Sequence, residues 1–97
     1  MKYNIKVAQS ASDDIDYYDK FDQQIIIKAI IEYLQFDAKS ESRKRKRLQP
    51  NPVAPWELRI GRYRVFYEIT EKQTVKILAV GHKEHSDLFI RGRKVEI

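Results

Sequence analysis

The side chains best suited to chemistry in this sequence are cations and acid–base groups in its second half. They are Arg59, Arg64, His82, Lys83 and His85. Histidine titrates near neutral pH and serves as a general acid or base, whereas arginine stays charged and supplies electrostatic stabilisation. Cleavage of RNA needs no more in principle, because the 2′-hydroxyl is an internal nucleophile and the protein has to orient the backbone, stabilise the pentavalent phosphate and move protons. The alternative is that both histidines are ordinary loop residues at the end of a strand.

Other kinds of site have little support in the sequence. The chain has no cysteine, which excludes thiol nucleophiles, disulfides and zinc ribbons. It has two histidines with few carboxylates near them, so we predict no metal site and no cofactor. Its glycines, Gly61, Gly81 and Gly92, are isolated from one another and do not form a phosphate-cradling loop. The remaining chemistry is that of positioned cations.

Two of these cations are placed by a predicted β-hairpin, Trp56–Ile69. Alternating apolar and polar residues flank Gly61-Arg62, and glycine at the first central position favours a two-residue type II′ turn. A turn this short fixes the register of the two strands, so Arg59 lies opposite Arg64. Like charges directly opposite each other destabilise a sheet, and the facing pair therefore predicts an anion-binding site.

The hairpin has one apolar face and one charged face, because side chains alternate along a strand. The apolar face carries Trp56, Leu58, Ile60, Tyr63, Val65, Tyr67 and Ile69. Glu57, Phe66 and Glu68 share the other face with the arginines. The alternative to an anion site is that Glu57 and Glu68 neutralise the arginines on a solvated face.

A run of consecutive basic residues precedes the hairpin. Residues 39 to 97 carry fifteen basic and seven acidic side chains, a balance of +8, and residues 1 to 38 carry four basic and seven acidic, a balance of −3, which together give the net charge of +5. A chain divided in this way has a basic face, whose partner is a phosphate backbone or an acidic protein. The run is a candidate RNA-binding strip, to which Arg62 on the hairpin turn adds a further cation; the alternative is a solvated helix tail or loop. The run consists of Arg43, Lys44, Arg45, Lys46 and Arg47.

The first part of the chain predicts a short strand and two helices. Tyr3–Ala8 alternates in the way of a strand with one buried face. Ser10 is a candidate N-cap for a short helix that ends at about Tyr18 or Asp19. Asp22 is a candidate N-cap for a second helix, Gln23–Phe36. Apolar residues cover most of the circumference of this second helix, so we expect it to be heavily buried.

The residues after the helices predict a proline-rich connector and three antiparallel strands. A short turn, Glu71–Gln73, leads from the hairpin to a third strand, Thr74–His82, which places His82 on the face of the two arginines and Lys76 opposite Glu68. The last residues form a final short hairpin or an extended tail. The fold class is therefore α+β: a strand and two helices followed by an antiparallel three-stranded meander, with both helices on the apolar face and the opposite face exposed.

Length and composition predict one domain, residues 1–97, with a single modest core. The sequence has no apolar segment of the signal-peptide type and none long enough to cross a bilayer. We therefore expect a soluble protein of the cytoplasm with no membrane partner.

The hairpin motif and a later Val-Gly-His-Lys segment resemble the RelE/ParE superfamily of bacterial toxins from type II toxin–antitoxin systems. The residues that carry the resemblance are the basic stretch ending in Leu48, the Asn51-Pro52 turn, WELRIGRYRVFYEI at Trp56–Ile69 and VGHKE at Val80–Glu84. The likeness covers most of the chain, including the order of its elements, and implies a RelE-like fold. The motif is specific for the superfamily and far less specific for the target of the toxin.

The resemblance also implies roles for individual residues. In RelE-like members, the arginine that corresponds to Arg64 stabilises the scissile phosphate, and Arg59 and Lys83 stand at further basic positions. Phe89 stands where the family has a functional tyrosine, so it can stack on a base but cannot exchange a proton. Glu57, which replaces a basic residue, joins His82 and His85 as a candidate for proton transfer.

Three functions are compatible with this resemblance. The first, which is the function we expect, is a metal-independent, ribosome-dependent mRNA endonuclease, or mRNA interferase, that inhibits translation and has the ribosome and mRNA as partners. The second is a ParE-like inhibitor of DNA gyrase that cleaves nothing. The third is a catalytically degenerate relative that binds only its antitoxin. In all three cases we expect a cognate antitoxin as partner, with a toxin–antitoxin hetero-oligomer as an open alternative.

Overall fold

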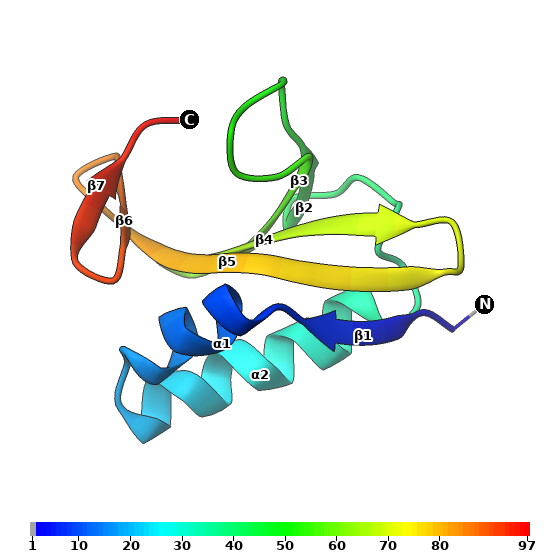
Figure 1. Ribbon diagram of the computed structural model, residues 1–97, viewed down its shortest axis with the longest axis horizontal. Helices are drawn as coiled ribbons and strands as arrows, with labels where there is room; N and C mark the ends of the chain where they lie inside the picture. The colour runs from blue at the N-terminus through cyan, green and yellow to red at the C-terminus, as the bar shows by residue number, and fades with distance from the viewer. Residues whose placement is uncertain (1) are drawn as a thin grey trace.

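Two helices cover one face of a β-sheet in the computed structural model, which describes residues 2–97 (Figure 1). The helices are α1, Gln9–Asp16, and α2, Lys20–Leu34. Within the described residues the strands are β1 Asn4–Val7, β2 Arg45–Arg47, β3 Trp56–Ile60, β4 Tyr63–Thr70, β5 Thr74–Glu84, β6 Asp87–Ile90 and β7 Arg93–Val95. Their order is β2-β3-β4-β5-β6-β7, and β1 also pairs with β5, in parallel. The predicted α+β class, with its strand, two helices and antiparallel meander, is confirmed.

The β3–β4 hairpin has the register that its turn predicts. Arg59 pairs with Arg64, and Gly61 has a φ of +54°. A type II′ turn requires a positive φ at its first central residue, which glycine adopts without steric cost. The short turn to β5 is confirmed as well, since Glu68 pairs with Lys76.

A β-bulge in β5 overturns the predicted face of His82. The register shifts where β4 passes from Phe66 to Tyr67, because Leu78 is an extra residue in β5. Beyond a bulge the side chains of a strand change sides relative to its partner. His82 therefore pairs with Tyr63 on the face that the helices cover, away from the arginines.

Two side chains of α1 form hydrogen bonds with β5 at this bulge. The bulge lies between the segment of β5 that pairs with β1 and the segment that pairs with β6. Ser10 Oγ donates to the carbonyl oxygen of Leu78 at 3.1 Å, and the N–H of Val80 donates to Asp14 Oδ2 at 3.0 Å. The prediction of Ser10 as an N-cap is thus wrong: Ala8 holds that position without a side-chain bond, and α1 ends earlier than predicted. The side chains satisfy strand groups that no neighbouring strand reaches.

Helix α2 begins and ends earlier than predicted and is less buried. Its N-cap is Asp19, whose carboxylate accepts a hydrogen bond from the N–H of Asp22 at 2.9 Å. Ile30 is 4% exposed, whereas Ile27 and Ile31 are 46% and 51% exposed. A sheet covers only one side of a helix, so the wide apolar stripe leaves a second side uncovered. Neither helix of residues 2–97 is long and apolar enough to span a lipid bilayer.

The main core lies between the helices and the sheet. Trp56 and Tyr67 stack within it with ring centroids 5.8 Å apart, and the Tyr67 hydroxyl donates to the carbonyl oxygen of Ala38 at 2.8 Å. Strand β1 packs Ile5 against this core, but Val7 is 47% exposed, so the predicted buried face of the strand is incomplete. Strand β1 pairs with β5 along the edge of the sheet and lies beside the helices (Figure 1).

The opposite face of the sheet is partly covered, against the expectation of an exposed face. Phe66 is fully buried there, packed with Ala54 from the connector and Leu88 from β6. The connector and the C-terminal hairpin β6–β7 rise from the sheet on the side away from the helices (Figure 1). A second, smaller hydrophobic cluster therefore underlies the face that carries the arginines.

Candidate functional site

The facing arginines share their sheet face with a buried glutamate. Arg59 Nε donates to Glu57 Oε1 at 2.7 Å. The side chain of Glu57 is 4% exposed and that of Arg59 is 45% exposed. Glu57 thus neutralises the charge of Arg59, which is one of the two alternatives that the sequence left open. The carboxylate, however, is buried rather than solvated. A buried carboxylate loses its hydration and needs a cation to stabilise its charge.

Arg64 is held by the turn and not by an acid. Its Nη1 donates to the carbonyl oxygens of Gly61 and Tyr63, at 2.8 Å each. Its Nε is buried and has no hydrogen-bond partner within residues 2–97. Burial lowers the pKa of Arg64, the Glu57 carboxylate raises it and the charge of Arg59 lowers it. Arg64 therefore keeps one unpaired donor, which a ligand oxygen could reach only if the groups that cover Nε move.

Two lysines share the face of the arginines by register. Lys46 pairs with Glu57 across β2 and β3. Lys83 follows Gly81, the partner of Arg64, by two residues, and its N–H donates to the carbonyl oxygen of Arg62 at 2.8 Å. The group that the fold gathers on this face consists of Lys46, Glu57, Arg59, Arg64 and Lys83.

His82 lies apart from this group in a buried hydrogen-bond chain. Its Nδ1 is 2.7 Å from the Tyr18 hydroxyl and its Nε2 is 3.2 Å from Glu84 Oε2, while the residue is 6% exposed. The Glu84 carboxylate can only accept, so Nε2 carries a proton and donates to it; in this neutral tautomer Nδ1 accepts from the Tyr18 hydroxyl. Burial raises the pKa of Tyr18, which keeps the hydroxyl protonated. Both ring nitrogens are thus engaged within the fold.

The other two predicted aromatic and acid–base residues lie on β6 and on the turn before it. Phe89 pairs with His82 and stacks on its ring, with centroids 5.8 Å apart and an interplanar angle of 20°. It therefore shares the helix-covered face. His85 is an exposed turn residue with a φ of +49°, followed by Ser86 with a φ of +73°. Two successive positive φ angles are typical of a type I′ hairpin turn.

The last three residues of the basic run form the edge strand β2, whereas Arg43 and Lys44 lie in the loop before it, and most side chains of the run contact the helix side of the sheet. Arg45 donates from Nε and Nη1 to two backbone carbonyls in and after α2, at 2.8 and 3.3 Å. Arg47 and Lys44 lie over the rings of Trp56 and Tyr33, 5.6 and 5.2 Å from the centroids. These cations stabilise the edge of the fold. Arg43 is exposed before the strand, and Arg62 lies 5.2 Å over the ring of Tyr63.

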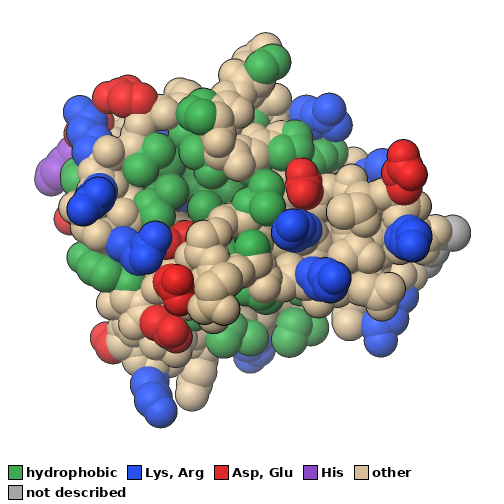
Figure 2. Space-filling view, in the orientation of Figure 1, with side chains coloured by type: hydrophobic (Ala, Val, Ile, Leu, Met, Phe, Trp, Pro, Cys, Tyr) green, Lys and Arg blue, Asp and Glu red, His purple; other side chains and the backbone are tan. Residues whose placement is uncertain are grey.

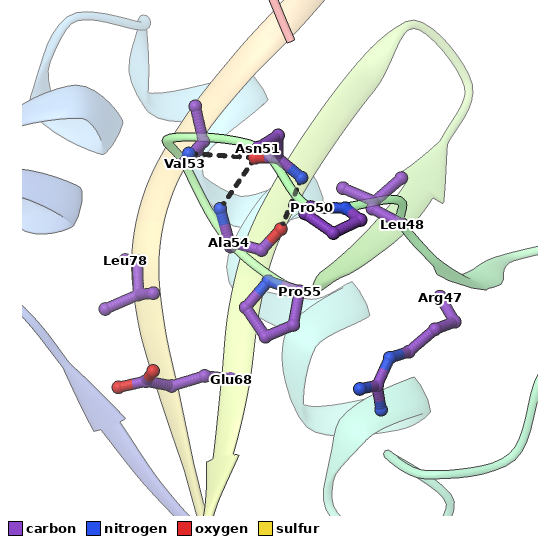
Figure 3. A pocket seen from close by; sticks show the side chains of 9 residues that line it. All are labelled: Arg47, Leu48, Pro50, Asn51, Val53, Ala54, Pro55, Glu68 and Leu78. Atoms are coloured by element: carbon purple, nitrogen blue, oxygen red, sulfur yellow. Dashed lines mark hydrogen bonds between the residues drawn. The ribbon is translucent and has the colours of Figure 1, made fainter.

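The connector between β2 and β3 borders an open cavity of about 380 Å³ against β4 and β5 (Figure 3). Asn51 closes the loop: its Oδ1 accepts from the N–H groups of Val53 and Ala54 at 2.8 and 3.0 Å, and its Nδ2 donates to the carbonyl oxygens of Gln49 and Ala54 at 2.8 and 2.9 Å. The lining residues are Arg47, Leu48, Pro50, Asn51, Val53, Ala54, Pro55, Glu68 and Leu78. Apolar side chains and polar groups, among them Arg47, Asn51 and Glu68, therefore share its lining.

Hydrophobic side chains gather between the connector and the C-terminal hairpin, with lysine and arginine side chains around them (Figure 2). The partly buried members of the cluster beneath this surface are Leu48, Val53, Leu78, Ala79, Ile90 and Val95. An apolar centre with a charged rim is the usual anatomy of a protein-binding surface.

Three residues that position the site were not among the sequence candidates. Asn51 had a local signal, since an asparagine within a proline-rich segment commonly bonds the backbone two residues on. Tyr18 and Asp14 had none, because their partners His82 and Val80 are 64 and 66 residues away. Burial raises the pKa of Asp14, while the Val80 N–H and Arg91, whose Nε is 2.8 Å from Oδ1, lower it.

Comparison with known proteins relates this arrangement to a toxin family. A family model described as "ParE toxin of type II toxin-antitoxin system, parDE" matches residues 5–86. No curated protein sequence matches the chain.

Two solved structures resemble the fold. One is the toxin–antitoxin complex RelBE2 from Mycobacterium tuberculosis, with 23% identity and a TM-score of 0.73 over 86% of this chain and 100% of the other. The second is the archaeal RelE–RelB complex from Pyrococcus horikoshii OT3, with 21% identity and a TM-score of 0.63 over 88% of this chain and 99% of the other. At this level of identity the likeness concerns the fold alone.

Proposed function

Because the chain belongs to the ParE toxin family of type II toxin–antitoxin systems, we propose that it is a toxin that acts by binding a protein target, DNA gyrase in the ParE manner, and not by cutting RNA. Both gyrase and the ribosome are cytoplasmic targets, so the proposal locates the protein in the cytoplasm.

The observation that carries this proposal is the state of the proton-transfer groups. Glu57 is buried and bonded to Arg59, and both ring nitrogens of His82 are engaged on the opposite face of the sheet. Phe89 has no hydroxyl. A general base must come within hydrogen-bond reach of the proton that it takes. Glu57 lies on the arginine face but is buried against Arg59, and His82 lies on the other face, whereas His85 lies on the exposed turn before β6. What remains is a surface suited to binding.

The experiment that tests the proposal is induction of the protein in bacterial cells. We expect DNA damage and loss of supercoiling activity in purified gyrase assays, with protein synthesis unaffected at early times. Sequencing of RNA 5′ ends should reveal no new cleavage sites. New cleavage within ribosome-bound messages would overturn the proposal, and absence of any growth defect would favour an inactive relative that binds only its antitoxin.

A second candidate is ribosome-dependent mRNA cleavage, which the cationic face favours. Arg59, Arg64 and Lys83 share that face, and the buried, unpaired Nε of Arg64 is a donor suited to a phosphate oxygen if the side chain turns outward. Under this alternative His85, Glu57 or His82 would have to transfer protons after a rearrangement, while Lys46 and Arg43 would hold the RNA. Arg64→Ala should then abolish cleavage, whereas Arg93→Ala, an exposed control on β7, should not.

We also propose a cognate antitoxin as partner, bound in a toxin–antitoxin hetero-oligomer. The two solved relatives are toxin–antitoxin complexes, as their names state. A groove of about 410 Å³ between β1, α1 and α2 is lined by apolar side chains, among them the exposed Val7, Ile27 and Ile31. An amphipathic segment could bury these side chains. Ile27→Asp should weaken neutralisation of toxicity by the co-expressed antitoxin, with Lys28→Asp as the neighbouring control.

A further inference from the structure

The anion beside the facing arginines is a side chain of the protein, the carboxylate of Glu57. Glu57 precedes Arg59 by two residues on β3, so both side chains lie on one face, and Arg59 faces Arg64 across the hairpin. The carboxylate of Glu57 is 2.7 Å from Arg59 Nε and 4% exposed. A solvent counterion is therefore not what compensates Arg59; a side chain of the protein does so from inside.

The guanidinium of Arg64 is oriented but incompletely bonded. The turn carbonyls of Gly61 and Tyr63 fix its Nη1, while Nε is buried without a partner in the described part of the chain. A buried unpaired donor costs free energy, and a phosphate oxygen would satisfy it once the groups that cover Nε move aside. The neighbouring carboxylate opposes that ligand, because like charges repel strongly where water is excluded.

We infer that Glu57 is a specificity-determining residue: its carboxylate fills the anion position beside Arg59 and Arg64 and excludes free phosphodiesters from the hairpin. Phosphate groups enter only where the carboxylate is removed or displaced. The inference rests on the proposed function, since it explains how a cationic toxin face binds a protein target without capturing cellular RNA. It concerns binding in the purified protein, so its failure is separable from failure of the gyrase proposal in cells.

The test compares Glu57→Gln with wild type in the binding of a short single-stranded RNA oligonucleotide. Glutamine has the same shape and its Oε1 still accepts from Arg59, but it carries no charge. We expect Glu57→Gln to bind the RNA roughly tenfold more tightly, the effect of one additional charge-assisted contact. The salt dependence of log Kd should steepen by about 0.7, as one more phosphate contact predicts for a single strand.

The matched control is Glu68→Gln. It removes one negative charge, as Glu57→Gln does, from the same face of the sheet, but on the neighbouring strand β4. Its affinity for the RNA should stay close to that of wild type, and the double variant Glu57→Gln with Arg64→Ala should lose the gain. Equal gains in Glu57→Gln and Glu68→Gln would attribute the effect to net charge and overturn the inference. Tight RNA binding by wild type would overturn it as well.

A second measurement applies if Glu57→Gln does not fold. The side-chain Nε–H signal of Arg59 in wild type, observed by NMR, should stay at its bonded position when inorganic phosphate is added at millimolar concentration. A shift that saturates at those concentrations would mean that phosphate displaces Glu57 readily, which contradicts the inference.

Discussion

At the scale of single residues, the hydrogen-bond chain from Tyr18 through His82 to Glu84 distinguishes a structural histidine from a reactive one. The hydroxyl and the carboxylate occupy both ring nitrogens, and Phe89 covers one side of the ring. Bonds of this kind fix a tautomer and reduce the availability of the ring for proton transfer. Sequence alone describes His82 as a titratable residue at a strand end.

Replacement of Tyr18 by phenylalanine tests this chain. The variant leaves the buried Nδ1 of His82 without its donor, so the free energy of unfolding should fall by about 1–3 kcal/mol. Urea denaturation measures the change. Tyr17→Phe is the control, because Tyr17 is 54% exposed. Loss of its hydroxyl should change the free energy of unfolding by less than about 0.5 kcal/mol. Equal effects of the two substitutions would contradict the proposed bond.

At the scale of elements, two segments differ from what their composition predicts. Helix α2 has isoleucines around most of its circumference, yet the sheet buries only one side. The connector 48–55 contains three prolines and resembles an open linker, yet Asn51 closes it over the sheet. The sheet that covers one side of α2 comes from a distant part of the chain, whereas the bonds that close the connector are local to it.

Neighbouring isoleucines of α2 should differ strongly in their contribution to stability. Ile30→Ala removes a side chain that is 4% exposed and should cost about 2–5 kcal/mol. Ile31→Ala removes one that is 51% exposed and should cost less than about 1 kcal/mol. The midpoints and slopes of urea unfolding measure both values. A large cost at Ile31 would mean that this side of the helix is covered in the free protein.

Asn51→Ala should loosen the connector without unfolding the sheet. The amides of Val53 and Ala54 lose the acceptor Asn51 Oδ1, so their hydrogen exchange should accelerate while the amides of β4 and β5 keep their protection. Gln49→Ala is the control, since its side chain is exposed. Unchanged exchange at Val53 and Ala54 would show that the prolines alone hold the loop.

At the scale of the whole molecule, the sheet separates a helix-covered core from a face that carries cations, an apolar cluster and the connector cavity. The core relies on two tyrosines whose hydroxyl groups are bonded internally, Tyr18 and Tyr67. This dependence makes the global stability sensitive to alkaline pH.

The stability of the protein should decline as the pH rises above the ordinary tyrosine pKa of about 10. Burial raises the pKa of Tyr18 and of Tyr67 in the folded state. A group whose pKa is higher in the folded state than in the unfolded state stabilises the fold at pH values below its unfolded-state pKa. That stabilisation is lost as the pH rises towards the folded-state pKa. Thermal midpoints from about pH 9 to about pH 12 measure the loss. Tyr67→Phe, which cannot ionise, should have a shallower decline, and an identical slope would contradict the assignment.

The fold class and the β3–β4 register could be predicted from the sequence because they depend on neighbouring residues. The Gly61-Arg62 turn and the alternation beside it determine which residues pair, and so place Arg59 opposite Arg64. The bulge at Leu78 could not be predicted, since Ser10 and Asp14 bond its free groups from a helix more than sixty residues earlier. That bulge moved His82 to the other face.

The same distinction applies to the candidate site. Spacing along β3 and β4 brought Glu57 together with Arg59 and Arg64, because strand periodicity is a local property. Tertiary structure decided that the glutamate is buried, that it bonds Arg59 and that Arg64 keeps a free Nε. The connector and β6, which come from other parts of the chain, fold over this face and bury Phe66, the cross-strand partner of Glu57. Whether the facing arginines are open to an anion is therefore a property of packing and not of spacing.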